Sequence, residues 1–300
     1  MTIYFSAIAQ GILWSIMGLG LFISFRILRF ADLTSEASFT MGAATAATLA
    51  TNGVHPVIAT LAAIVAGMFA GFITGFLTTY FEIPALLASI ITLTGLYSIN
   101  LRIMGNPNLS FRGTETVFDL MGQLFDNVLY ARLAIGIIFV LICILIMIFF
   151  FKTDIGQAVI ATGDNEIMAN SLGINTPNMI RVALMFANGL IALSGALVAQ
   201  DNGFSDIQMG SGTVVVAMSS IVIGEVLLKN ELTLSRRLIS IIVGAVIYRL
   251  ILVFVLRLGF NSNDFRLISA TVLAMFLAFP SVKAKLSPKT NTIGSKGGGN

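Results

Sequence analysis

Cysteine, histidine and charged residues are scarce in this 300-residue sequence, and their scarcity excludes several classes of function. The one cysteine, Cys143, lies in an apolar run, which excludes a disulfide framework and a cysteine-based metal site. The one histidine, His55, precedes Pro56 in a short loop, where a turn residue is expected. The sequence has no G-x-x-x-x-G-K-S/T motif, which excludes ATP binding through a Walker loop. We therefore expect no catalytic residue, no metal site and no cofactor in this chain.

Apolar residues make up 57% of the sequence and charged residues only 10%, with a mean hydropathy of +0.95. These values lie outside the usual range of soluble proteins and indicate a polytopic, all-α transmembrane bundle. A membrane-spanning helix needs about 20 apolar residues. Eight stretches satisfy this requirement: 4–25, 56–80, 83–104, 129–151, 178–200, 211–228, 234–257 and 264–282.

A ninth stretch, residues 32–51, is rich in small and polar residues and begins with Asp32 and Glu36. Such a segment is tolerated in a membrane only inside protein or beside a wet cavity. It is either an interior helix or a broken, re-entrant one. We thus predict eight or nine spanning or re-entrant helices in a single domain, residues 1–286, followed by a flexible cytoplasmic tail, residues 287–300.

Basic residues at the ends of these stretches predict the orientation, because Lys and Arg accumulate on the cytoplasmic side. Most of these basic residues lie on the cytoplasmic side if the N-terminus is outside and residues 152–177 and the C-terminus are cytoplasmic. The basic residues then inside are Arg26, Arg29, Lys152, Lys229, Arg236, Arg237, Lys283, Lys285, Lys289 and Lys296. Charges that flank helices in this way explain a pI of about 9.2 without a nucleic-acid partner.

Gly67, Gly71 and Gly75 recur every four positions on one helix face, a spacing that lets two backbones approach closely. We favour packing within the bundle, with a seam between two copies as the alternative.

Residues 152–177, the polar segment, interrupt two apolar stretches with the sequence KTDIGQAVIATGDNEIMANSLGINTP. Thr153 or Asp154 can cap a short helix, and Asp164 or Asn165 can cap a second one. Gly173 is suited to the position after that second helix, and Pro177 stops its continuation. We predict a helix, a turn and a helix outside the membrane. An amphipathic helix lying on lipid head groups is the alternative, but few Lys and Arg residues are present to favour it.

The polar segment resembles the cytoplasmic coupling segment of ATP-binding-cassette (ABC) importer permeases of the branched-chain amino acid and ribose type. The resemblance rests on the pattern T-D-x-G-x-A-x-x-A-x-G-D-N-x-x-x-A-x-x-L-G-I-N, which begins at Thr153 and ends at Asn175. The helix that follows, with Gly189 and Ser194 to Leu197, is similar to the A-G-x-x-G-A-L helix of the family. Within this family, the residues of the polar segment look most similar to those of the tryptophan/tyrosine permease branch. One position departs from the pattern, because the family usually carries Arg where this chain has Ile160.

The resemblance implies a bacterial plasma-membrane permease without enzymatic activity of its own. Two permease copies, expected here as a homodimer, would form the pathway, while cytoplasmic ABC ATPases would bind ATP and Mg and grip the polar segments. An extracytoplasmic binding protein would deliver an amino acid, with tryptophan or tyrosine suggested by the branch and branched-chain amino acids, nucleosides or sugars left open. The residues assigned to ATPase coupling are Asp154, Gly156, Gln157, Thr162, Gly163, Asp164, Asn165 and Glu166.

Polar side chains within spans are costly in lipid and therefore tend to face a cavity or another helix. On this basis the candidates for the substrate pathway are Gln10, Trp14, Thr92, Thr94, Asn100 and Asn188. For each, a structural role is the alternative, because Ser and Thr often bond helix carbonyls and Asn can bridge helices.

A secondary transporter or channel driven by an ion gradient is the alternative function. Its ion sites would be Asp32, Glu36, Glu82 and Glu225. Against it, the first three are expected at cytoplasmic ends of helices, and Glu225 within a turn of one. An intramembrane enzyme has no support, since the sequence lacks paired intramembrane aspartates and an HExxH motif.

Overall fold

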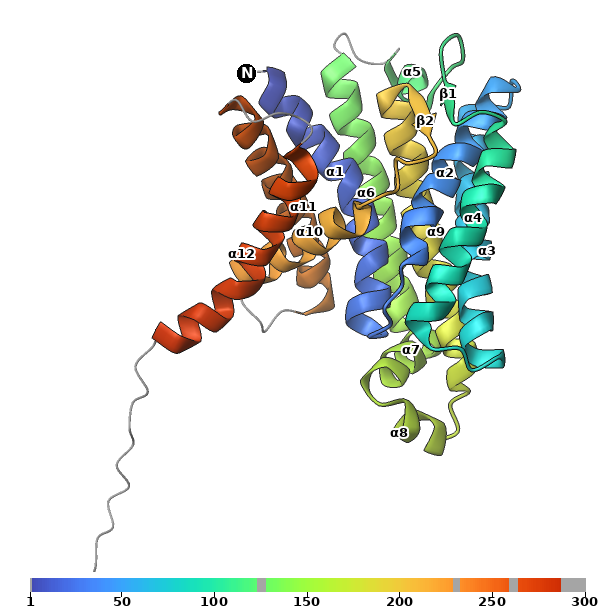
Figure 1. Cartoon of the computed structure of the whole chain (residues 1–300), viewed down its shortest axis with the longest axis vertical. Coiled ribbons are helices and arrows are strands. Elements are labelled where there is room, and N and C mark those ends of the chain that lie inside the picture. The colour runs from blue at the N-terminus through green and yellow to red at the C-terminus, as the bar shows by residue number, and fades with distance from the viewer. Residues whose placement is uncertain (1, 123–127, 229–232, 259–263, 287–300) are drawn as a thin grey trace, which may run out of the picture.

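The computed structural model describes residues 2–122, 128–228, 233–258 and 264–286. Lys229 and the predicted tail, residues 287–300, lie outside the described residues. Helices dominate the described chain, and Figure 1 shows the long ones running between two ends of a bundle. The first half contains α1 (Thr2–Phe22), the π-helical turn η1 (Ile23–Ile27), α2 (Thr34–Thr51), α3 (Pro56–Tyr80), α4 (Ala85–Met104), β1 (Asn108–Ser110) and α5 (Val117–Gly122). The second half contains α6 (Val128–Lys152), α7 (Asp154–Asp164), α8 (Glu166–Ser171), α9 (Thr176–Asn202), β2 (Phe204–Asp206), α10 (Thr213–Leu228), α11 (Leu234–Arg257) and α12 (Phe265–Leu286).

Each of the nine predicted ranges contains a helix, which confirms the all-α polytopic fold. Six helices in the described part of the chain are long and apolar enough to cross a membrane: α1 with η1, α3, α4, α6, α9 and α11. Residues 213–228 and 267–278 form shorter apolar helices. Figure 1 places the N-terminal end of α1 and the pair α7 and α8 at opposite ends of the bundle.

The stretch at 32–51 forms a continuous interior helix, α2, which settles the alternatives left open by its composition. Its 18 residues extend about 27 Å at 1.5 Å per residue. Small residues allow α2 to pack closely on α9: a Cβ added at Gly42 would overlap the backbone of Ala192. Most of its side chains are buried. A helix of this low hydropathy is therefore tolerated inside the bundle because protein, not lipid, surrounds it.

The glycine series of α3 also packs against α9. Added Cβ atoms at Gly67 and Gly71 would overlap the carbonyl oxygens of Asn188 and Leu184, and one at Gly75 would crowd Arg181. Packing within one chain is therefore confirmed. Helix α9 is the centre of the bundle, since it is covered by α1, α2 and α3.

The predicted span at 211–228 needs a correction at its start. Helix α10 has only 16 residues and begins inside the bundle, where Gly210 packs against Glu36 and Thr40 of α2. The segment before it starts at the opposite end from α7, where β2 pairs antiparallel with β1, joining Ser110 to Phe204 and Asn108 to Asp206. This strand pairing was not predicted from the sequence. Non-helical backbone therefore enters the interior at residues 207–212.

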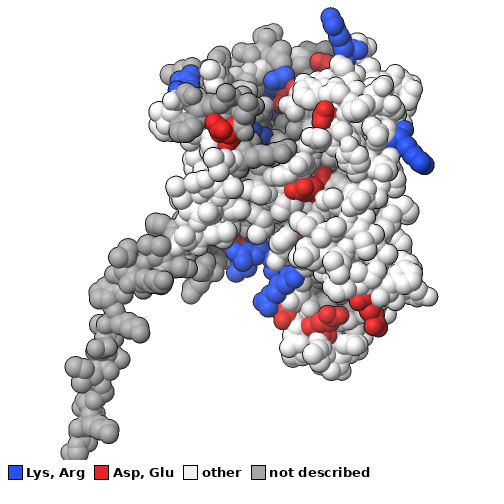
Figure 2. Space-filling model, in the orientation of Figure 1, with Lys and Arg blue, Asp and Glu red and all other residues white. Residues whose placement is uncertain are grey.

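Charged side chains gather toward the two ends of the face seen in Figure 2, and most of the surface between them is uncharged. Acidic side chains lie over the end formed by α7 and α8, with basic side chains next to them. On this face, the mostly uncharged surface between the two ends fits the apolar belt of a membrane protein.

Candidate functional site

The polar segment folds as the sequence predicts. The Thr153 hydroxyl accepts a hydrogen bond from the Gly156 N–H (3.2 Å) and caps α7. Asn165 accepts from the Met168 N–H (3.0 Å) and caps α8. Gly173 follows α8 with a φ of +86°, a conformation that favours glycine. Pro177 lies in the first turn of α9, so the segment is joined directly to two long helices, α6 and α9.

Two glycines hold α7 against the end of the bundle. An added Cβ at Gly156 would overlap the Phe150 carbonyl oxygen of α6, and one at Gly163 would overlap the Ile27 carbonyl oxygen of η1. Arg29 and Asp164 form an exposed ion pair at 3.5 Å beside this contact. Backbone lies against backbone at both places, so α7 is closely packed on α6 and η1.

The residues assigned to coupling divide into two groups. Asp154, Gln157, Asp164, Asn165 and Glu166 are exposed, whereas Gly156 and Thr162 are buried and Gly163 is half-buried. The Thr162 hydroxyl donates to the Ala158 carbonyl (2.7 Å), and the Gln157 amide donates to the Phe151 carbonyl. The exposed side chains can be reached by a partner, and Gln157 together with the buried residues holds the segment in place.

The segment also exposes large apolar side chains outside the apolar belt. Ile167 is 82% exposed and Leu172 is 70% exposed, and Met168 lies beside Ile167. Exposed apolar residues at the end of a bundle are typical of a protein contact. Ile160, the departure from the family pattern, is partly buried and packs against the main core. At this position an apolar side chain supports the docking of α7 onto the bundle.

The predicted pathway residues are distributed over three places. Gln10 and Trp14 line a cavity of about 240 Å³ between α1, α9 and α11, together with Asp201 and Arg249. The Arg249 guanidinium lies over the Trp14 ring, 4.6 Å from its centroid. Cation–π contact therefore accounts for an arginine within a span.

Asn188 belongs to a different, wholly buried contact. Its amide donates to the Asp32 carboxylate (2.8 Å) and to the Leu184 carbonyl (3.0 Å). Asp32 in turn accepts from the Thr34 N–H (2.9 Å) at the start of α2. The expectation that Asp32 lies at a cytoplasmic end is wrong: its side chain is 0% exposed and bonds near the middle of α9. Asp32 is buried because the chain between η1 and α2 turns into the bundle.

Asn100 lines a second cavity of about 320 Å³, formed by α2, α4 and the segment before α10. Glu36 and Tyr97 line the same cavity, and Glu36 lies in the first turn of α2, in agreement with the expected position at a helix end. Thr92 is buried and bonds the Ala88 carbonyl (3.0 Å). Thr94 bonds the Ile90 carbonyl (2.8 Å) and is exposed, outside this cavity lining. Tyr97 and the segment 207–211 could not be predicted from the sequence, because nothing local indicates that this backbone folds inward.

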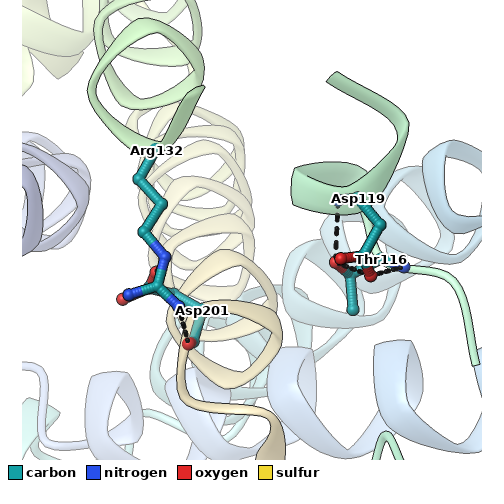
Figure 3. Close-up of polar contacts among 4 residues, drawn as sticks. All are labelled: Thr116, Asp119, Arg132 and Asp201. Atoms are coloured by element: carbon teal, nitrogen blue, oxygen red, sulfur yellow. Dashed lines mark hydrogen bonds and ion pairs between the residues drawn. The ribbon is translucent and has the colours of Figure 1, made fainter. Parts of the chain in front are cut away.

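At the end opposite the polar segment, Arg132 of α6 reaches toward Asp201 of α9 (Figure 3). The Arg132 Nε lies 3.1 Å from the Asp201 Oδ1, and the aspartate is nearly buried. Beside this ion pair, Thr116 and Asp119 bond each other at the start of α5, with the Thr116 hydroxyl donating to the Asp119 carboxylate (2.7 Å). These residues line a cavity of about 730 Å³ that also reaches Gln200. The bundle thus has a wide polar depression at this end.

Known proteins resemble the chain over nearly its whole length. The family described as "Branched-chain amino acid transport system / permease component" matches residues 3–279. A tyrosine transport system permease protein of Clostridioides difficile is 41% identical, over 95% of this chain and 96% of that protein. An autoinducer 2 import system permease protein of Yersinia enterocolitica is 31% identical over 67% of this chain and 54% of its own length. The solved structure of PsaBC from Streptococcus pneumoniae in complex with Fab has a TM-score of 0.50 and is 17% identical in sequence. The match covers 94% of this chain and 93% of that chain, and it shows similarity of fold alone. The chain belongs to the family of branched-chain amino acid transport system permease components.

Proposed function

We propose that this chain is the permease subunit of an ATP-binding-cassette importer and that its polar segment receives the motion of a separate ATPase. The observation that carries the proposal is the construction of that segment. Two capped helices lie outside the apolar belt and expose Ile167, Met168 and Leu172. Glycines of the first helix pack closely against α6 and η1. ATP-driven movement of a partner bound there would shift the ends of the spans.

The orientation follows from the same segment. With the polar segment in the cytoplasm, the N-terminus lies outside, because Figure 1 places it at the opposite end of the bundle. Arg26 and Arg29 then lie on the cytoplasmic side, in agreement with the positive-inside rule. The polar depression around Arg132 and Asp201 faces outward, where an extracytoplasmic binding protein would dock. We place the protein in a bacterial plasma membrane.

We propose an amino acid as the substrate, with tyrosine or tryptophan as the first to test. Support comes from the tyrosine permease of Clostridioides difficile, which is similar over nearly the full length of both chains. A homodimer of permeases completes the proposal, since an importer pathway of this type needs two such subunits. A purified complex that contained a second, different permease chain would contradict the homodimer.

Co-expression with candidate ABC ATPases and affinity purification test the proposal. We expect an ATPase to co-purify with the chain and to be lost from the variant Glu166→Lys, whereas Glu115→Lys at the other end retains it. Tyrosine uptake into proteoliposomes that contain the whole complex should require ATP. Uptake that followed an imposed ion gradient and ignored ATP would instead support the secondary-transporter alternative, with Asp32 or Glu36 as the ion site.

A further inference from the structure

The cavity lined by Glu36 and Asn100 has features of a binding site. It lies between α2, α4 and the segment 207–211, and its volume of about 320 Å³ falls in the range of small-molecule sites. Its lining combines apolar side chains, such as Leu93 and Ile207, with a few polar groups. Such a combination binds small organic molecules when the polar groups match them.

Two polar groups of this cavity, on Glu36 and Asn100, can accept hydrogen bonds from a ligand. The Glu36 carboxylate lines it and accepts from the Gly212 N–H (2.9 Å). Asn100 is 1% exposed, and its Oδ1 has no hydrogen-bond partner among the described residues. The Asn100 amide nitrogen donates to the Ala37 carbonyl (3.2 Å), and because a carbonyl can only accept, this bond fixes which side-chain atom is the oxygen. A buried acceptor without a donor costs free energy, so a ligand that brings an N–H is favoured.

The charge of the cavity also favours a ligand that carries an N–H group, in particular a cationic one. Glu36 brings a carboxylate to this lining. A carboxylate in such surroundings attracts a cation. The aromatic ring of Tyr97, also in the lining, adds a surface that attracts an ammonium group or stacks with another ring.

The backbone indicates that water reaches this cavity. Residues 207–212 are not helical, yet they lie inside the bundle, where Gly210 contacts Glu36. Irregular backbone at such depth is tolerated only inside protein or beside water. Gln208 and Ser211 are exposed in this lining, and an amide and a hydroxyl facing lipid would be costly. The open side of the cavity therefore faces an aqueous path.

We propose that this cavity binds the ammonium group of the transported amino acid, with Glu36 supplying the negative charge and the Asn100 Oδ1 accepting an N–H. The proposal rests on amino-acid import as the function and specifies where the pathway recognises its substrate. Tyramine, which has the ammonium group and ring of tyrosine, should then bind. 3-(4-Hydroxyphenyl)propionate, which has the ring and carboxylate without the amine, should not.

Thiol labelling of the full-length chain in nanodiscs tests this site directly. Cys143 is buried and is replaced by Ala, and Ser211→Cys places one thiol in the cavity lining. A charged, water-soluble thiol reagent should label Ser211→Cys. Tyramine at about ten times its Kd should slow this labelling about tenfold by mass action, and the propionate should leave it unchanged. Ser171→Cys, exposed on the polar segment outside the apolar belt, is the control: the same reagent should label it, and tyramine should give no protection.

Two further variants test the assigned residues in the Ser211→Cys background. Glu36→Gln keeps an oxygen for the Gly212 N–H but removes the charge, and Asn100→Leu removes the acceptor at similar volume. Each should abolish protection by tyramine while labelling in its absence stays unchanged. If one variant fails to fold, the other provides the same test.

Three results would overturn the assignment: no labelling of Ser211→Cys, equal protection by tyramine and the propionate, or equal protection by NaCl at the same concentration as tyramine. The last would mean that charge alone is recognised. None of these measurements uses the ATPase, so they can fail while ATP-dependent import stands. The import proposal can fail in turn while the amine site stands.

Discussion

Asn188 donates a 2.8 Å hydrogen bond to the Asp32 carboxylate and thereby joins the middle of α9 to the residue that holds the start of α2. Both side chains are 0% exposed. A buried carboxylate is tolerated only when its oxygens are hydrogen-bonded, so this contact fixes how the chain enters the bundle after η1.

We predict that Asn188→Leu destabilises the protein by about 1–3 kcal/mol, because it leaves a buried Asp32 oxygen without its donor. The exchange of both residues, Asp32→Asn with Asn188→Asp, restores one amide and one carboxylate and should recover part of the loss. Thermal unfolding in detergent, followed by the fraction of monodisperse protein, measures both. Equal stability of Asn188→Leu and the native chain would show that the contact contributes nothing.

Gly163 supports the second prediction, which concerns the docking of α7. Gly163→Ala should destabilise the contact with η1, since an added Cβ overlaps the Ile27 carbonyl oxygen and overpacking typically costs about 1–3 kcal/mol. Gly95→Ala is the matched control, because that glycine is helical and exposed and has nothing within 4 Å of an added Cβ. We expect ATP-dependent uptake to fall in the first variant and to persist in the second. Unchanged uptake in Gly163→Ala would mean that α7 transmits no motion through this contact.

Patterns of neighbouring residues correctly predicted the helices and the helix, turn and helix of the polar segment. Thr153, Asn165 and Gly173 act through neighbours a few residues away, so cap and turn chemistry could be inferred from the sequence. Contacts between residues far apart in the sequence could not be inferred in the same way. Glu36 meets Gly212 only because the backbone after β2 folds inward, and hydropathy carries no signal for that path. Asn100 was predicted as a pathway residue from its polarity, whereas its neighbours in the cavity could be identified only from the structure.

The ion pair between Arg132 and Asp201 supports the third prediction. Arg132→Gln should destabilise the end of the bundle opposite the polar segment, because it removes a partner 3.1 Å away from a carboxylate that is only 5% exposed. The cost should be about 1–3 kcal/mol, since the arginine itself is partly in water. Arg112→Gln, an exposed change in the same cavity lining, is the control and should stay within about 0.5 kcal/mol. The difference in thermal unfolding between the two variants is the measurement, and equal unfolding temperatures would contradict a stabilising pair.

The exposed apolar side chains of α8 support the last prediction. Ile167→Ser should leave the stability of the isolated permease within about 0.5 kcal/mol, because the side chain is 82% exposed and packs little within the chain. It should nevertheless weaken ATPase binding by about 30-fold or more if Ile167 is an anchor of the contact, since such residues typically contribute at least about 2 kcal/mol. Phe204→Ser, also exposed and apolar but at the opposite end of the bundle, should not alter ATPase binding. Titration of the purified ATPase against each variant in nanodiscs gives the two affinities. Equal affinities would place the ATPase contact elsewhere on the polar segment, and loss of binding in both variants would point to a general defect of the permease.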